Sequence, residues 1–202
     1  MNALVVPDLF ARDAADRRFV SDQVAADCEW VLAGEGKATR QYNGICVLYD
    51  PLLGVEPFGV PLALMPQLQG WWVRRTVKVG QDFPTDYVVA DVDAAAGRVA
   101  GWEPVEQSPA TAAFLAQALV VTAGRGDGPG VGTHELIGPK INRNPERVRT
   151  HVLIAHVDAD VLPAPRTYDG LRAWLPTQPY EGVVFQHSDG RMAKAKRRDF
   201  RA

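Results

Sequence analysis

The sequence predicts a single α+β domain built mostly from antiparallel strands. Short segments of alternating apolar and polar residues recur along the chain, with turn-forming Gly, Pro, Asn and Asp between them, and convincing helical patterns are few. Apolar residues make up 47% of the 202 residues, enough to build a hydrophobic core, so a disordered chain is not expected. No internal repeat or linker is apparent in the sequence, and one domain over residues 1–202 is expected.

The N-terminal third is predicted to contain a short helix between Asp13 and Ala26, followed by two strands. The strands are expected at Cys28–Ala33 and Ala38–Tyr49, with a turn at Gly34–Glu35–Gly36 between them. Four prolines and three glycines in 51–70 then predict a long irregular connection.

The remainder is predicted to be strand-rich, with two helices. The helix at Ser108–Thr122 has a serine that can cap its start and a proline in its first turn. A second helix of about two turns is expected at Tyr168–Leu175. Residues 80–101 are expected to be mainly loop. The predicted strands are Trp71–Val79, Tyr87–Ala90, Thr133–Ile137, His151–His156 and Gly182–His187.

Composition and charge favour a reduced, cytoplasmic protein without a membrane partner. The N-terminus has no basic stretch before its apolar run, which argues against a signal peptide. The longest uncharged run, Pro57–Val73, is interrupted by proline and is a poor membrane span. Two cysteines, Cys28 and Cys46, cannot form a disulfide framework. No feature indicates an obligate protein partner.

The positive charge is concentrated at the C-terminal end. The last 12 residues carry six basic side chains and one acidic one, while the chain as a whole has a net charge of −2. Such an end is typical either of a local anion site or of a solvated terminus.

Two lysines and two carboxylates suggest a nucleotide site. Lys194 and Lys196 are two residues apart, so in a strand both ammonium groups project from one face and suit a polyphosphate. Glu135 and Glu181 each lie in an apolar context, where a carboxylate needs a partner or a metal. Together with Arg74 they would form a site for a magnesium nucleotide. Each group taken alone could instead be an edge-strand charge facing water.

Five segments carry a resemblance to a known superfamily. They are TRQYNG at 39–44, GWEPVE at 101–106, ELIGPKINRNP at 135–145, THVLIAH at 150–156 and YEGVVFQHSDGRMAKAK at 180–196. In their order and in their amino-acid sequences they resemble the motifs of the covalent nucleotidyltransferases, which include DNA ligases, RNA ligases and mRNA capping enzymes. The similarity is greatest to small single-domain ATP-dependent RNA 5′→3′ ligases.

The resemblance implies a nucleotidyltransferase (ATP-grasp-like) fold of antiparallel sheets flanked by a few helices. It also implies ATP and Mg²⁺ (or Mn²⁺) as cofactors, and RNA with 5′-phosphate and 3′-hydroxyl ends as substrate. In that family a motif lysine becomes a lysyl–AMP, the AMP passes to the RNA 5′-phosphate, and the 3′-hydroxyl displaces it.

The chain departs from the family at the nucleophile. When Gly44 is aligned with the motif glycine, Gln41 stands at the position of the lysine, and glutamine has no nucleophilic amine. Lys37 shares the strand face but lies about 13 Å away along a strand, too far to replace it. The chain is therefore either an inactivated form of a ligase or a natural relative that binds nucleotide or RNA ends without ligating. A DNA ligase or capping-type enzyme is a third possibility.

The resemblance also assigns roles to other residues. Lys194 and Lys196 match lysines that neutralise the triphosphate, and Glu135 and Glu181 match carboxylates near the ribose and metal. The remaining nucleotide-binding candidates are Arg40, Asn43, Gly44 and either Arg74 or Arg75. RNA-binding candidates are Arg143, Arg147, Arg197 and Arg198.

Overall fold

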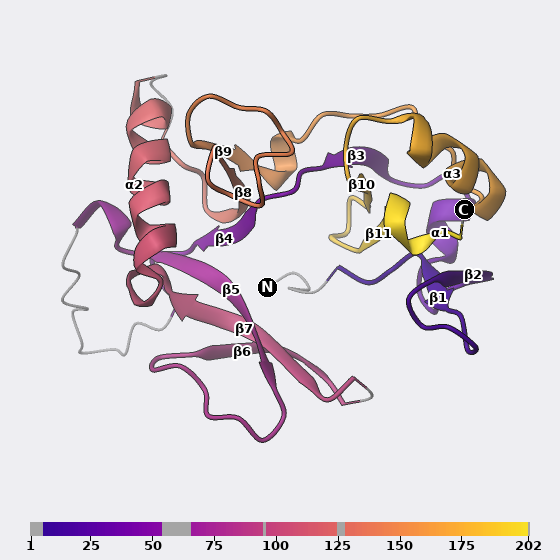
Figure 1. The fold of residues 1–202 in the computed structure, drawn as a ribbon, viewed down its shortest axis with the longest axis horizontal. Coiled ribbons are helices and arrows are strands. Elements are labelled where there is room, and N and C mark those ends of the chain that lie inside the picture. The colour runs from indigo at the N-terminus through magenta and orange to yellow at the C-terminus, as the bar shows by residue number, and fades with distance from the viewer. Residues whose placement is uncertain (1–5, 54–65, 95, 125–127, 202) are drawn as a thin grey trace. The chain divides into compact units, whose positions relative to one another are not determined.

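The computed structural model describes residues 6–53, 66–94, 96–124 and 128–201 (Figure 1). The chain folds into two compact units, the first made of residues 1–42 and 159–202 and the second of residues 43–158. Every strand pair in the described sheets is antiparallel and the helices are few, which confirms the α+β prediction. None of the helices in these residue ranges combines the length and the apolar character that a membrane span needs.

The first unit is centred on a three-stranded sheet with the order β11-β10-β3. The N-terminal segment runs beside β11, because the Leu9 amide donates to the Lys194 carbonyl at 2.7 Å. On the other edge, the Arg40 amide donates to the Asp160 carbonyl at 2.8 Å. The elements of this unit are β1 (Phe10–Arg12), β2 (Val20–Val24), α1 (Glu29–Leu32), β3 (Lys37–Gln41), α3 (Tyr168–Trp174), η4 (Leu175–Thr177), β10 (Gly182–Gln186), β11 (Met192–Lys196) and η5 (Arg197–Asp199).

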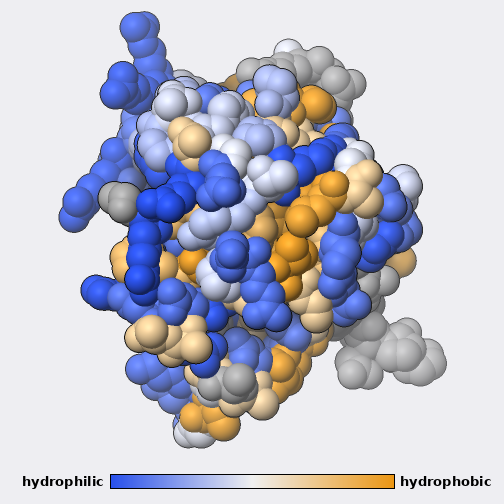
Figure 2. Space-filling model, turned by 90° about the vertical axis from the view of Figure 1, so that its right-hand side faces the viewer, coloured by the Kyte–Doolittle hydropathy of each residue, from blue (hydrophilic) through white to orange (hydrophobic). Residues whose placement is uncertain are grey.

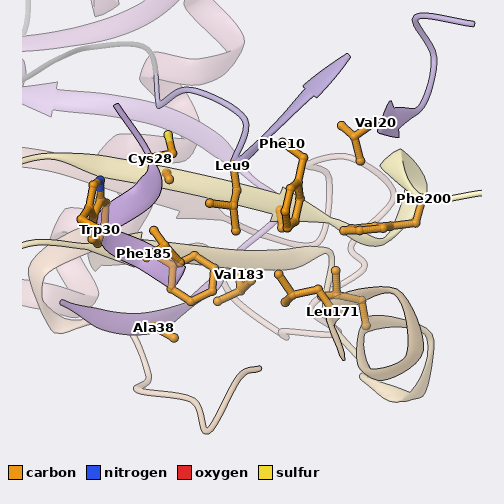
Figure 3. Close-up of a cluster of buried hydrophobic side chains, with 14 residues drawn as sticks. Leu9, Phe10, Val20, Cys28, Trp30, Ala38, Leu171, Val183, Phe185 and Phe200 are labelled. Atoms are coloured by element: carbon orange, nitrogen blue, oxygen red, sulfur yellow. The ribbon is translucent and has the colours of Figure 1, made fainter. Parts of the chain in front are cut away.

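One face of this sheet forms the core of the first unit. Alternate strand residues point into it, because successive side chains of a strand face opposite sides. Figure 3 shows Val183 and Phe185 of β10 among side chains from α1, α3 and the N-terminal segment. Phe200 packs edge-on against Phe10, with ring centroids 6.2 Å apart, so the chain is anchored just before its C-terminal end.

The second unit contains a six-stranded sheet with the order β6-β7-β5-β4-β8-β9. Helix α2 covers one face, where Leu115 and Ala118 are fully buried with Val47, Val73 and Leu136 of the strands (Figure 1). The elements are β4 (Ile45–Tyr49), η1 (Pro66–Leu68), β5 (Trp71–Lys78), β6 (Val88–Asp93), β7 (Arg98–Pro104), η2 (Val105–Gln107), α2 (Pro109–Ala123), β8 (Gly132–Ile137), β9 (Val152–Ala155) and η3 (His156–Asp158).

Two predictions for the N-terminal third are wrong in the type of element. The expected helix between Asp13 and Ala26 is replaced by the hairpin β1–β2, because Phe10 and Val20 are needed in the core. The expected strand Cys28–Ala33 is the helical turn α1, which buries Trp30 and Val31.

The predicted strand Ala38–Tyr49 is two strands. Strand β3 belongs to the first unit and β4 to the second, and the chain leaves the ladder between Gln41 and Ile45. At Gly44 a Cβ atom would overlap the Leu136 carbonyl, so only glycine fits at this position. This close approach explains the glycine that appeared to lie inside one long strand.

Most later elements agree with the sequence. Helices α2 and α3 and strands β5, β8, β9 and β10 lie within two residues of their predicted bounds. However, β6 extends to Asp93, three residues beyond the strand expected at Tyr87–Ala90, and β7 at 98–104 is a strand that the sequence did not predict. Ser108 does not cap α2 with its side chain; its hydroxyl donates to Glu103 Oε1 at 2.8 Å, and Glu103 is buried. Of the expected 51–70 connection, 54–65 lie outside the described residues.

Candidate functional site

A row of three residues crosses the sheet of the first unit and brings position 41 into line with Lys196. Gly182 of β10 pairs with Gln41 of β3 on one side and with Lys196 of β11 on the other. Directly opposite residues in a sheet project from the same face, so Gln41 and Lys196 share a face with only a glycine between them. Lys194 lies on this face in the next row, opposite Val184.

Gln41 has an unsatisfied acceptor in this row. Its side-chain Oε1 is buried and has no hydrogen-bond partner in the described parts of the chain. A Cβ atom at Gly182 would lie 2.9 Å from this oxygen and would overlap the Ala195 carbonyl. Glycine at position 182 therefore allows β3, β10 and β11 to pack closely beside Gln41, and it leaves Gln41 Oε1 as a buried acceptor whose hydrogen-bonding capacity is unused.

The two predicted phosphate lysines have different partners. Lys196 Nζ lies 2.8 Å from Glu181 Oε1, and both side chains are mostly buried. Arg198 approaches the same oxygen at 3.8 Å. Lys194 Nζ donates to the Val6 carbonyl at 2.6 Å. The shared strand face was therefore predicted correctly, while the ion pair that fixes Lys196 was not.

Arg40 projects from the opposite side of β3, because it is adjacent to Gln41 in the strand. Its guanidinium lies 4.5 Å from the centre of the Tyr42 ring and 5.6 Å from that of Tyr180. It also lies 3.6 Å from Asp160. These contacts stabilise the end of β3 by cation–π and ionic interactions.

In the second unit, a loop after β8 holds the chain at Asn43 and Gly44. The Asn142 side-chain amide donates to Asn43 Oδ1 and to the Gly44 carbonyl, both at 2.9 Å. Glu146 Oε1 accepts from the Asn43 amide at 3.0 Å. Asn142, Arg143 and Asn144 have φ of 46°, 64° and 54°, a left-handed backbone that side-chain hydrogen bonds must stabilise.

Glu135 connects this turn to a histidine. Its Oε1 accepts from the Gly44 amide at 2.8 Å, and its Oε2 lies 3.1 Å from His156 Nε2. Cys46 is its cross-strand neighbour in β4. Burial raises the pKa of the Cys46 thiol to about 12, with the Glu135 charge acting in the same direction and Arg74 against it.

The structure separates the two arginines of β5. Val73 faces α2, so Arg74 projects from the other face, where Cys46 and Glu135 also lie. Arg75 is on the α2 side, 3.7 Å from the buried Glu103 carboxylate. Of the two candidates left open by the sequence, Arg74 is thus the one that shares a face with Glu135.

The proposed RNA-binding arginines are at the surface of their units. Arg143 and Arg147 are exposed in the loop after β8. Arg197 and Arg198 are exposed in η5, where Arg197 donates to the Gln178 carbonyl at 3.2 Å. Figure 2 shows hydrophilic side chains over much of the face that it displays, with apolar residues between them.

Comparison with known proteins does not assign the chain to a family: no family model matches it, and no curated protein is similar to it. Sequence reasoning missed Cys46, Asn142, Glu146 and His156. Their only signal in the sequence was their presence in or beside the five motif segments, because their contacts depend on the pairing of strands.

Proposed function

We propose that this chain is an ATP-dependent RNA ligase of the covalent nucleotidyltransferase type, in a form that binds ATP without forming lysyl–AMP because Gln41 stands at the nucleophile position. The row Gln41–Gly182–Lys196 is the observation that supports it. It aligns the position of the motif nucleophile with a lysine that can neutralise phosphate, and the glycine between them adds no side chain to that face.

The residues of the first unit fit a phosphate-bearing ligand. Lys196 is held in place by Glu181, and the mostly buried pair positions its ammonium group without leaving it uncompensated. A triphosphate would compete with Glu181 for Lys196. The nearby Gln41 side chain, which lacks an amine, could donate its amide N–H to a phosphate oxygen but could not attack it.

ATP would supply the adenylyl group, and its Mg²⁺ would neutralise phosphate charge. Glu181 is a poor ligand for that cation, because Lys196 and Arg198 already lie against its Oε1. We therefore assign Glu181 the role of orienting Lys196.

Restoring the lysine tests the proposal. Gln41→Lys should become covalently labelled when it is incubated with ATP labelled at the α-phosphate and resolved by denaturing electrophoresis. The parent chain should bind ATP in calorimetry and stay unlabelled. Gln41→Arg is the matched control, because it adds the same charge without a comparable nucleophile.

The outcomes separate the alternatives. Labelling by GTP instead of ATP would indicate a capping-type enzyme, and transfer of AMP to nicked DNA but not to RNA would indicate a DNA ligase. ATP binding without labelling of Gln41→Lys would favour a non-catalytic binding protein, which the absent amine at position 41 also supports. Absence of both binding and labelling would refute the nucleotidyltransferase proposal.

A further inference from the structure

Three side chains with metal-binding groups meet within the second unit, on the face of its sheet opposite α2. The Cys46 thiol, a Glu135 carboxylate oxygen and a His156 ring nitrogen all lie within 4.8 Å of one another. In a tetrahedral zinc site with ordinary bond lengths, ligand atoms are about 3.3–3.8 Å apart. Shifts of roughly 1 Å, within reach of small side-chain rotations, would bring the three groups to coordination distance.

We propose that Cys46, Glu135 and His156 bind a divalent transition metal ion, with Zn²⁺ as the representative ion. Thiolate and imidazole ligands favour such ions over Mg²⁺ and Ca²⁺, which prefer oxygen ligands. Three protein ligands leave a fourth position for water or an anion. The site lies within one unit and does not rest on the proposed ligase function.

The surrounding hydrogen bonds orient two of the ligands. Glu135 Oε1 is held by the Gly44 amide at 2.8 Å, which leaves Oε2 directed to His156. His156 Nδ1 lies 2.9 Å from the Thr133 hydroxyl. When Nε2 binds a metal, Nδ1–H can donate to this hydroxyl. Hydrogen-bond partners of metal-binding histidines commonly fix the required tautomer in this way.

The charges around the three ligands favour a moderate affinity for the metal ion. A thiolate and a carboxylate balance the two charges of the ion, and the imidazole binds as a neutral group. Arg74 projects from the same face of the neighbouring strand, and its positive charge opposes a cation. The same charge favours an anion at the fourth position.

Titration of the full-length chain with Co²⁺ as a spectroscopic substitute for Zn²⁺ tests the site. We expect saturable binding of one ion with a thiolate-to-cobalt charge-transfer band in the near ultraviolet, reversed by Zn²⁺ and unaffected by excess Mg²⁺. The chain has two cysteines, so the band must come from Cys46 or Cys28. Cys28 is buried in the core of the first unit and supplies the matched control.

Cys46→Ala should abolish the band and Cys28→Ala should keep it, with thermal unfolding of both variants confirming that they fold. His156→Gln should weaken Co²⁺ binding at least about tenfold. Thr133→Val removes the hydrogen-bond partner of His156 and should weaken Co²⁺ binding by about 10- to 100-fold, the usual effect of losing such a partner. No saturable binding to the parent chain, or a band that persists in Cys46→Ala, would overturn the proposal. These results are independent of ATP labelling, so failure of either proposal leaves the other testable.

Discussion

Gly182 lies between Gln41 and Lys196 in the first unit's sheet, and its lack of a side chain allows the three strands to pack closely at this row. The sequence shows a glycine in an apolar strand, where glycine is normally unfavourable. Its reason is steric, because any Cβ there would overlap the Ala195 carbonyl. A conformational reason does not apply, since Gly182 is not among the described glycines with positive φ.

Gly182→Ala should therefore destabilise the chain by about 1–3 kcal/mol, the usual cost of adding a methyl group to a well-packed region. Urea denaturation monitored by tryptophan fluorescence measures it. Gly128→Ala is the control, because a Cβ at Gly128 would meet nothing within 4 Å. Equal stability of the two variants would mean that β10 and β11 can separate slightly at no cost.

At the scale of elements, β3 and β4 show how one sequence pattern can serve two sheets. Residues 38–49 suggest a single strand in the sequence, yet β3 pairs with β10 and β4 with β5 and β8. Local periodicity predicts extended backbone, but it carries no information about which strand becomes the neighbour. The lone glycine in the pattern was the only local sign of the break.

Helix α2 is joined to the segment after β8 through His151. The ring stacks on Phe114, with centroids 4.5 Å apart, and Nδ1 donates to Gln117 Oε1 at 2.9 Å. Its Nε2 is buried and has no partner among the residues that the structure describes. Burial, with a smaller contribution from Lys140, lowers the pKa of His151 below 6.5.

A histidine whose pKa is lower in the folded state stabilises the fold above its unfolded pKa, and this stability is lost as the pH falls through the folded value. We expect the free energy of unfolding to decrease as the pH is lowered from about 6.5. His151→Phe keeps the stacked ring, removes the titration and should flatten this part of the curve. Denaturation at pH 5 to 8 checks it, and parallel curves for parent and variant would contradict it.

At the scale of the whole molecule, the chain separates its charges. The last 12 residues hold six of the 22 basic side chains and only one of the 24 acidic ones. The basic segment is ordered where it is described: Phe200 is buried, and Arg201 lies 3.0 Å from Asp13. Exposed ion pairs of this kind are weak, so these arginines can exchange their partners for phosphate.

Replacement of Arg197, Arg198 and Arg201 by alanine should weaken RNA binding and leave ATP binding largely intact, since Lys194 and Lys196 remain. RNA affinity of the parent should fall with salt with a log–log slope of about 0.7 per phosphate contact, for roughly two to four contacts in all. Fluorescence anisotropy at several salt concentrations measures both effects.

A charge-matched control removes Arg17, Lys78 and Arg98, which are exposed and lie outside the basic segment. If the control lowers RNA affinity as much as the first triple variant, the effect is one of net charge. An unchanged affinity and slope in the first variant would place RNA elsewhere, for example along Arg143 and Arg147.

The sequence by itself determined the α+β class, the helices α2 and α3, the strands β5, β8 and β10, and the common face of Lys194 and Lys196. These features follow from periodicity and local turn chemistry. Only the tertiary structure decided that Gln41 aligns with Lys196, that Glu181 holds that lysine, and that Cys46, Glu135 and His156 come together. Such contacts depend on which strands pair and in which register, which are set by packing between residues far apart in the chain.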